Sequence, residues 1–204
     1  MIPPTTAIAD VLALRGHGGW LSPPLKAASP GAAVGTARTV SLQPGTGGFG
    51  LLYELLSSDL TGKVIVVDTP DDDVAVWGAI LGTAAAGAGA AAAVVAGAVR
   101  DVAGLALPTW ARTVATVGPA GALEVAAIGN PAEIAGVHVA DGDTVVVDDD
   151  GVVALHAAEA ESVLADAGAY AEAEDRVAAA LLADTPLREA YRHKADVVAR
   201  LTAT

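Results

Sequence analysis

Residues 62–101 read GKVIVVDTPDDDVAVWGAILGTAAAGAGAAAAVVAGAVRD, and this stretch decides the fold. It holds two apolar runs, Lys63–Asp68 and Ala91–Val99, each of strand length and apolar on both faces, as in buried parallel strands. Between them, the alanine-rich segment Val74–Ala86 is predicted to be a helix, opened by the acidic turn Asp71–Asp73. A strand, a helix and a second strand in this order predict an α/β sheet.

The same stretch raises the alternative of a membrane span, because no charged residue occurs from Val74 to Val99. That length exceeds what a bilayer requires. The segment is, however, rich in alanine and glycine, which insert weakly, and its pattern changes from helix to strand midway. We therefore predict a buried helix and strand, and no membrane association.

Shorter elements flank this unit on both sides. Further strands are predicted at Ala33–Leu42, Thr113–Val117, Leu123–Ala127, Val137–Val139, Thr144–Asp148 and Val152–Leu155. Helices are predicted at Thr6–Leu14, after Gly50 through Leu56, after Asp101 to Leu105, and at Glu159–Ala167, Glu172–Leu182 and Leu187–Leu201. The long segment Gly16–Gly31 is expected to be a loop. Hairpins and crossover units together predict the α/β class with a mixed sheet and helices packed on it.

Composition narrows the classes of function. The chain has 204 residues, of which 53% are hydrophobic and 17% charged, as in a globular protein. Its formal net charge is -13, and its 11 basic residues are scattered, so we expect no nucleic-acid partner. The absence of cysteine excludes disulfides and thiolate chemistry. The N-terminal stretch MIPPTTAIAD lacks the pattern of a signal peptide, and we expect a cytoplasmic location.

Several segments resemble ligand-binding motifs but lack residues or positions that those motifs require. Gly45–Gly50 lacks the lysine and hydroxyl pair of a P-loop, and Gly87–Gly89 precedes a strand instead of following one. Asp148–Asp150 has no glutamate at the spacing of a calcium loop and is predicted to be a hairpin turn. The four histidines share no metal-ligand spacing; they are His17, His138, His156 and His193.

Six collinear segments resemble the RraA-like family. They are GTARTV (35–40), GKVIVVD (62–68), AVWGAILGTAAA (75–86), VVAGAVRD (94–101), LPTWAR (107–112) and GVHVADGDTVVVDDDGVVAL (136–155). The resemblance extends from about Ile8 to Tyr191. It implies a swivelling β/β/α sandwich over residues 1–168 that assembles as trimers, some of them paired into hexamers. It further implies that residues 169–204 form a helical extension packing on a neighbouring subunit.

The resemblance also implies an active site for a small 2-oxo acid. In the family's aldolases, the arginine of an Arg-Asp pair binds the pyruvyl carboxylate and keto oxygen, and the aspartate anchors a divalent cation mostly through water. These roles fall on Arg100 and Asp101. The carboxylate cradle falls on the backbone of Trp77, Gly78, Ala79, Ile80 and Leu81. A guanidinium fits such oxygens bidentately, and a helix N-terminus presents free N–H groups to an anion.

The cation implied by the resemblance is Mg²⁺ or Mn²⁺. A hard cation with few protein ligands and several waters has this character. It would stabilise the pyruvate enolate that forms when a carbon–carbon bond breaks. The family's regulatory branch, which binds RNase E, typically lacks the metal aspartate, whereas this chain keeps Asp101.

The chain departs from the aldolase pattern at one position. Family aldolases carry an aspartate after the Trp-Gly or Phe-Gly pair, where it positions a catalytic water, and here that residue is Ala79. A second acid, lent by the C-terminal helix of a neighbouring subunit, falls on Glu174. The sequence therefore leaves three functions open: a 2-oxo acid aldolase or oxaloacetate-type decarboxylase, a repurposed lyase or isomerase, and a non-catalytic regulatory trimer.

Overall fold

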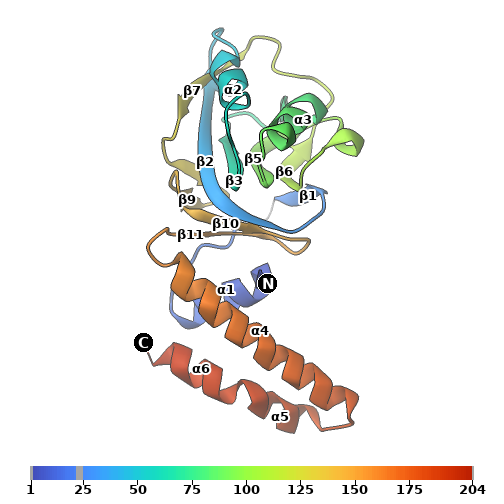
Figure 1. Cartoon of the computed structure of the whole chain (residues 1–204). Coiled ribbons are helices and arrows are strands. Elements are labelled where there is room, and N and C mark those ends of the chain that lie inside the picture. Colours follow the sequence, from blue (N-terminus) through green and yellow to red (C-terminus); the bar gives the residue numbers. More distant parts are fainter. Residues whose placement is uncertain (1, 22–24, 204) are drawn as a thin grey trace.

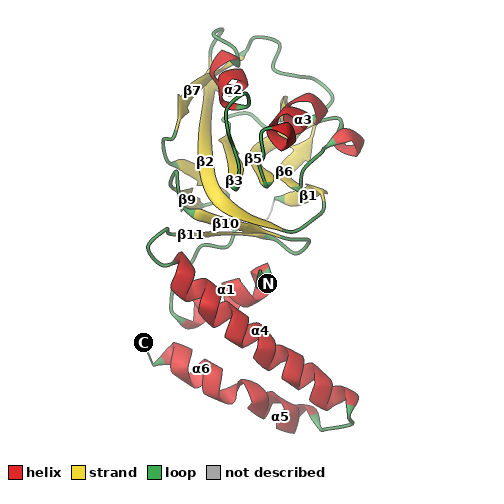
Figure 2. Cartoon of the chain, in the orientation of Figure 1, coloured by secondary structure: helices red, strands yellow, loops and turns green. Residues whose placement is uncertain are grey.

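Most of the chain's strands lie in one curled mixed sheet, below which the N- and C-terminal helices pack (Figure 1). The computed structural model describes residues 2–21 and 25–203. Over these residues the sheet order is β1-β6-β5-β3-β2-β10-β11, with β4 paired to β5 and β7 paired to β2. Figure 2 shows that helices α2 and α3 lie at one end of the sheet and α1, α4, α5 and α6 at the other.

The strands have the following bounds: β1 Lys26–Ser29, β2 Ala33–Pro44, β3 Lys63–Asp68, β4 Ala75–Trp77, β5 Ala92–Val99, β6 Thr109–Val114, β7 Leu123–Ile128, β8 Ala132–Ile134, β9 Val137–Val139, β10 Thr144–Val147 and β11 Val152–Leu155. The helices are α1 Thr5–Leu14, α2 Gly50–Leu55, α3 Ala79–Gly87, α4 Ala160–Leu182, α5 Leu187–Ala190 and α6 Ala195–Thr202, with short 3₁₀ turns η1 Val102–Gly104 and η2 Tyr191–Lys194. The predicted α/β class with a mixed sheet and C-terminal helices is confirmed.

The centre of the sheet is parallel. β2 pairs with β3, β3 with β5 and β5 with β6, all in parallel, and β4 adds a short parallel pair to β5. All eight residues of β5 are buried, because one face contributes to the core under α2 and α3 and the other to the core under β8 to β11. The two apolar runs predicted as buried strands are thus confirmed as β3 and β5.

The predicted helix Val74–Ala86 is wrong in its first part. Ala75–Trp77 form strand β4, and the helix α3 begins only at Ala79. The boundary is Gly78, whose extended backbone (φ -178°, ψ -168°) ends the strand and caps the helix. Bulky Val76 and Trp77 favour the strand, where they are buried against the core.

The acidic turn Asp71–Asp73 therefore precedes a strand and caps no helix. The amide of Asp73 donates to the Asp71 carboxylate (2.7 Å), and Asp72 lies 3.4 Å from the guanidinium of Arg112. The acids stabilise their own loop and its contact with β6.

Other boundaries shift for tertiary reasons. The predicted strand Thr113–Val117 is β6, Thr109–Val114, and the predicted helices on either side of residue 168 are the single helix α4. Gly168 sits inside α4, and a division of the chain at residue 168 would cut this helix; that division stays a prediction. The predicted loop Gly16–Gly31 contains β1, which pairs with β6, and the short strand β8 was not predicted. The predicted C-terminal helix is divided into α5, η2 and α6.

The predicted hairpin turn at Asp148–Asp150 is confirmed and has a second role. The amide of Asp148 donates to the carbonyl of Gly151 (3.1 Å), closing the turn between β10 and β11. Its carboxylate accepts hydrogen bonds from the amide and hydroxyl of Thr5, at 2.7 and 2.6 Å. An anion at the first turn of α1 favours that helix electrostatically.

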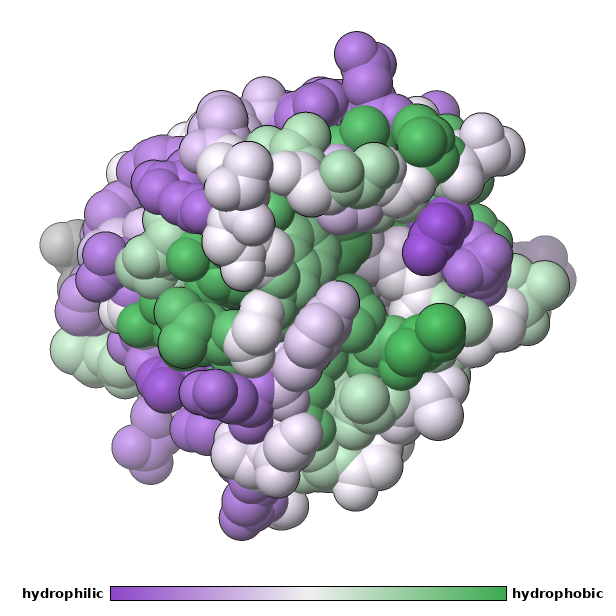
Figure 3. Space-filling model, turned by 90° about the horizontal axis from the view of Figure 1, so that it is seen from above, coloured by the Kyte–Doolittle hydropathy of each residue, from purple (hydrophilic) through white to green (hydrophobic). Residues whose placement is uncertain are grey.

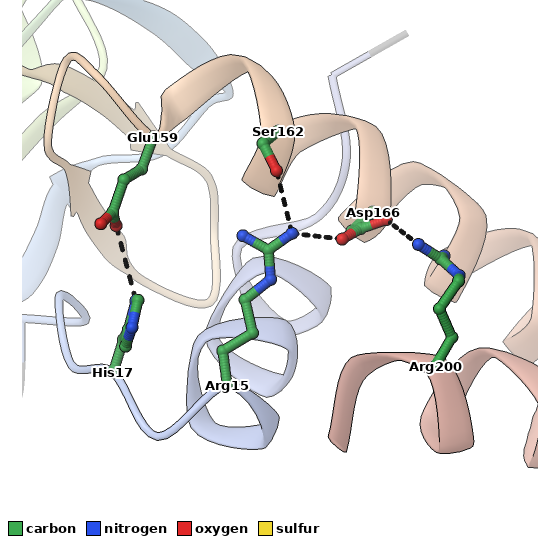
Figure 4. Close-up of polar contacts among 6 residues, drawn as sticks. All are labelled: Arg15, His17, Glu159, Ser162, Asp166 and Arg200. Carbon is green, nitrogen blue, oxygen red and sulfur yellow. Dashed lines mark hydrogen bonds and ion pairs between the residues drawn. The ribbon is translucent and has the colours of Figure 1, made fainter. Parts of the chain in front are cut away.

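An ion-pair cluster joins the terminal helices. Asp166 on α4 binds both Arg15, which follows α1, and Arg200 on α6, and Ser162 accepts a further bond from Arg15 (Figure 4). The Asp166 side chain is only 16% exposed. Burial raises the pKa of this carboxyl, but the hydrogen bonds and charges of Arg200 and Arg15 outweigh burial and lower it below the ordinary value.

No described helix is long and apolar enough to span a membrane.

We predict that Asp166→Asn destabilises the protein by about 1.5–3 kcal/mol at pH 7, the range for hydrogen bonds to charged groups. The lowered pKa means that the charged form is favoured by folding. The stabilisation is therefore present above the ordinary pKa of 3.8 and is lost as the pH falls through the folded-state value. Urea unfolding at pH 7 and at about pH 3 should show a difference between variant and wild type that shrinks in acid.

The matched control is Glu159→Gln. Glu159 lies 3.5 Å from His17, and both side chains are about half exposed. Removing an exposed pair of this kind changes stability by less than about 1 kcal/mol. An equal loss in both variants would mean that the Asp166 cluster contributes no more than a surface pair.

Candidate functional site

The candidate site lies where parallel strands end. The carboxyl ends of β4, β5 and β6 meet at one edge of the sheet, and ligands of open α/β sheets bind beyond such ends. A cavity of about 360 Å³ opens there, which is within the size range of small-molecule sites. Its lining comes from α2, β4, α3 and the end of β5, as follows: Phe49, Tyr53, Leu56, Ser57, Ala75, Val76, Trp77, Gly78, Ile80, Leu81, Ala84, Arg100, Asp101 and Pro119.

Arg100 stands directly after β5 and is held by its backbone. Its amide donates to the carbonyl of Trp77 (3.0 Å), which continues the β4–β5 pairing by one residue. Its side chain is 46% exposed and lies beside Gly118, where a Cβ would be 3.4 Å from the Nη1 atom. The Nε atom is 3.7 Å from the Asp101 carboxylate, too long for a strong hydrogen bond. The guanidinium is thus free to bind an anion in the cavity.

Asp101 turns the chain sharply out of the strand. It has a left-handed backbone (φ 53°, ψ 41°), a conformation that few residues except glycine, asparagine and aspartate adopt readily. Its carbonyl accepts from the amide of Gly104 (2.8 Å) and begins η1. The side chain is 58% exposed and faces the cavity beside Arg100. Residues of this conformation cluster at functional sites.

The N-terminus of α3 completes the polar side of the site. The first bond within the helix runs from the Gly82 amide to the Gly78 carbonyl (2.9 Å), and no side chain caps the helix. The amides of Ala79, Ile80 and Leu81 consequently have no partner within the helix. Gly78 is needed for close approach: a Cβ there would lie 3.1 Å from Arg100 Cγ and 3.4 Å from the Asp101 carboxylate.

Trp77 is core and cavity wall at once. Its side chain is 1% exposed and belongs to the main core cluster, yet it lines the cavity. Its indole Nε1 is buried without a hydrogen-bond partner among the described residues. Buried donors are normally satisfied. This atom lies on the side of Gly82, where a Cβ would be 3.7 Å from it, and Gly82 does not line the cavity.

The donor set fits a weakly held hard cation. Over the described residues no group of three or more histidine and carboxylate side chains is arranged to hold a metal. Asp101 supplies a single exposed carboxylate at the cavity edge. Mg²⁺ keeps most of its waters and binds through one or two carboxylates, so one acid suits it, whereas a dehydrated all-protein cage is ruled out by these ligands.

Two of the predicted site residues, Ala79 and Glu174, do not line the cavity. Ala79 does not line the cavity: its methyl group faces η1, 3.0 Å from where a Cβ of Gly104 would lie. Glu174 lies on α4, in the helical layer at the other end of the molecule (Figure 1), where Lys194 binds it at 2.8 Å. Within one chain Glu174 therefore cannot reach the cavity. Its expected role across a subunit boundary stays a prediction.

One wall of the cavity was not predicted from the sequence. Phe49, Tyr53 and Leu56 follow each other at four- and three-residue spacing and present one face of α2 to the cavity. That spacing is the signal of a helix face. It also matches an ordinary core stripe, so the spacing alone does not predict that the helix faces a cavity.

The face that contains the cavity is apolar. Seen from above, hydrophobic residues surround a hollow (Figure 3). Large side chains exposed near it, on α2, at the start of α3 and around the end of β6, are Leu51, Tyr53, Ile80, Val114 and Val117. Exposed apolar side chains gathered on one face are a feature of surfaces that bind a ligand or another protein.

These features define an α/β protein with a cavity at the carboxyl ends of its central strands, where an arginine, an aspartate and a helix N-terminus meet. Residues 5–154 match the RraA-like family, described as Aldolase/RraA. The chain belongs to the RraA-like family.

Solved structures agree with this assignment. A protein of Pseudomonas syringae pv. tomato is 26% identical, with a TM-score of 0.81 over 92% of both chains. RraAS2 of Streptomyces coelicolor, an unusual member of the RNase ES inhibitor RraA family, is 26% identical, with a TM-score of 0.72 over 85% of this chain and 91% of that one. The RNA-processing inhibitor RraA of Thermus thermophilus is 27% identical, with a TM-score of 0.63 over 76% of this chain and 93% of that one.

Proposed function

We propose that the protein is a divalent-metal-dependent carbon–carbon lyase that acts on a 2-oxo acid and forms the enolate of its product. The observation that carries this proposal is the placing of Arg100 and Asp101 beside the free amides of α3, at one end of one cavity. A guanidinium and a helix N-terminus together bind the carboxylate and keto oxygen of a 2-oxo acid. Asp101 would hold Mg²⁺ or Mn²⁺, which withdraws electrons from the keto oxygen when bound.

Decarboxylation is the reaction that the residues favour. In an oxaloacetate-type acid, the bond between C3 and the leaving carboxyl carbon breaks, CO₂ departs, and the electron pair passes to the keto oxygen. Arg100 stabilises this developing charge, and a proton from water then completes C3. No side chain has to remove a proton before the bond breaks. Aldol cleavage, in contrast, begins with removal of a hydroxyl proton, and Ala79 cannot position a base.

The regulatory alternative is supported by two similar proteins: RraA of Thermus thermophilus is an RNA-processing inhibitor, and RraAS2 of Streptomyces coelicolor is an unusual member of the RNase ES inhibitor RraA family. Against it stand the retained Asp101 and a cavity that reaches Arg100. A repurposed lyase or isomerase would use the same anion site with different proton donors.

A cytoplasmic location also remains part of the proposal.

We expect Asp101→Asn to abolish binding of Mg²⁺ or Mn²⁺ without unfolding the protein. Asparagine tolerates the left-handed backbone of residue 101 but lacks the charge that a hard cation requires. Calorimetric titration with each metal measures the effect. Asp73→Asn is the control, because Asp73 is an exposed acid of the neighbouring loop that does not line the cavity. Equal binding to wild type and Asp101→Asn would refute the metal site.

We expect the wild-type protein to release pyruvate from oxaloacetate, and to cleave 4-hydroxy-4-methyl-2-oxoglutarate weakly or not at all. The Ala79 methyl group faces η1, which begins directly after Asp101, and the longer side chain of aspartate can hold a water there. Ala79→Asp should therefore raise aldol cleavage more than decarboxylation, since a positioned base contributes roughly 10²–10⁴-fold. Thr83→Asp, an exposed position one turn further along α3, controls for added charge. Pyruvate release is measured for both substrates with Mg²⁺ and Mn²⁺. If neither reaction occurs in wild type or Ala79→Asp, the lyase proposal is wrong.

We further propose that the protein is a homo-oligomer, a trimer or a pair of trimers, in which residues 169–204 pack on a neighbouring subunit. Exposed apolar side chains that do not line the cavity support this. Leu51, Val114 and Val117 lie on α2 and around the end of β6, and Leu181, Leu182, Leu187 and Tyr191 lie on the C-terminal helices. Light scattering at micromolar concentration should give about 60 kDa, three times the 20.0 kDa subunit, or twice that mass. A mass of one subunit would contradict the proposal.

A further inference from the structure

The cavity has a second half whose chemistry differs from that of the Arg100 end. The wall formed by α2 and by the first turns of α3 is hydrocarbon: Phe49, Tyr53 and Leu56 come from the α2 side, and Leu81 and Ala84 from α3. Aromatic residues make up only 3% of the chain, with one Phe, three Tyr and three Trp. Three of these seven, Phe49, Tyr53 and Trp77, line this one cavity. Such a concentration in an aromatic-poor chain indicates a surface built to contact an apolar group.

Charge in the cavity is confined to its other end. Among the described residues that line it, only Arg100 and Asp101 are charged, and the hydroxyls of Tyr53 and Ser57 are the other polar side-chain groups apart from the Trp77 indole. Arg100 is committed to the 2-oxo acid carboxylate under the proposed function. A second carboxylate that stays on the substrate would therefore meet the α2 wall without a cation from the same chain. An unpaired charge against an apolar surface loses hydration and gains nothing in return.

A carboxylate that leaves is in a different position. Bond cleavage converts it into neutral CO₂, and an apolar wall favours the neutral product over the charged group. The α2 wall is thus compatible with the loss of a carboxylate and unsuited to holding one. This distinction separates a substrate's departing group from the substituent that the product keeps.

From these observations we infer that the substrate is a 2-oxo acid with a hydrocarbon substituent, aromatic or branched, on the carbon chain beyond the keto group. The inference rests on the proposed function, because it takes Arg100 as the anchor of the 2-oxo acid. The carboxylate and keto oxygen lie at Arg100 and the α3 amides, and the hydrocarbon substituent lies against Phe49, Tyr53 and Leu56. No second carboxylate is retained in the product.

The test compares two binding probes that differ only at the far end. 2-Oxo-4-phenylbutanoate carries a phenyl group where 2-oxoglutarate carries a carboxylate, and neither can lose CO₂ through the enolate route. Calorimetric or competition binding in Mg²⁺ should show the phenyl compound bound at least about tenfold more tightly, the order expected when a hydrocarbon group enters a matching pocket and a charge does not. Pyruvate, with no distal group, should bind more weakly than the phenyl compound.

A charge placed on the α2 wall should reverse the preference. Tyr53 is 57% exposed, so Tyr53→Arg alters the cavity without disturbing the core. It supplies a cation for a distal carboxylate, and we expect 2-oxoglutarate to gain on the order of 10²-fold relative to the phenyl compound, so that it becomes the tighter ligand. Ser58→Arg adds the same charge at an exposed residue after α2 that does not line the cavity, and should leave the preference unchanged.

Arg100→Ala separates this inference from the proposed function. If 2-oxoglutarate binds as tightly as the phenyl compound or more tightly, and both lose affinity in Arg100→Ala, the hydrocarbon subsite is wrong while the 2-oxo acid site stands. If neither compound binds, or if Arg100→Ala changes the binding of neither, the proposed function itself fails. A preference for the phenyl compound that depends on Arg100 and is reversed only by Tyr53→Arg supports both.

Discussion

The burial of β5 between two cores is the constraint on which the rest of the structure depends. Its small side chains let helices approach one face and the β8–β11 layer approach the other, and every residue from Ala92 to Val99 is buried as a result. Because both faces of the strand are buried, charged residues can only follow it at its end. Arg100 and Asp101 stand there, fixed by pairing to β4 and by the left-handed turn. The position of the site thus follows from the packing of the strand before it.

The sequence predicted what hydrophobic periodicity controls. Strands β3 and β5, the hairpin turn at Asp148 and the helical C-terminus follow from local runs and turn residues, and the family resemblance assigned Arg100 and Asp101. The wrong prediction of a helix at Ala75–Trp77 has a physical cause. Val76 and Trp77 are compatible with helix and strand alike, and only pairing with Ala98 and Val99, far along the chain, makes them a strand.

Local patterns predicted the candidate site only in part, because a cavity has walls that are distant in sequence. Phe49 and Tyr53 resemble core residues at helical spacing, and nothing near them in sequence indicates that they face the same space as Arg100. Ala79 shows the opposite limit. Its amide has no partner within α3, at the place where the family resemblance predicts contact with the substrate, but its methyl group faces η1, a direction that the motif does not reveal. Glu174 forms an ion pair with Lys194 of its own chain, and its position in the sequence does not predict this pair.

Electrostatics gives a reason for an arginine, an aspartate and a divalent cation to occur together in the proposed site. A protein of net charge -13 repels an anionic substrate, and screening at physiological salt weakens that repulsion beyond about 8 Å. Within that distance the charges of Arg100 and Asp101 cancel, leaving only the dipole of α3 to attract an anion. A divalent cation at Asp101 would make the site positive overall. The proposed metal would then contribute to substrate binding as well as to stabilising the enolate. Asp101, whose own charge opposes an anionic substrate, would favour its binding through the cation that it holds.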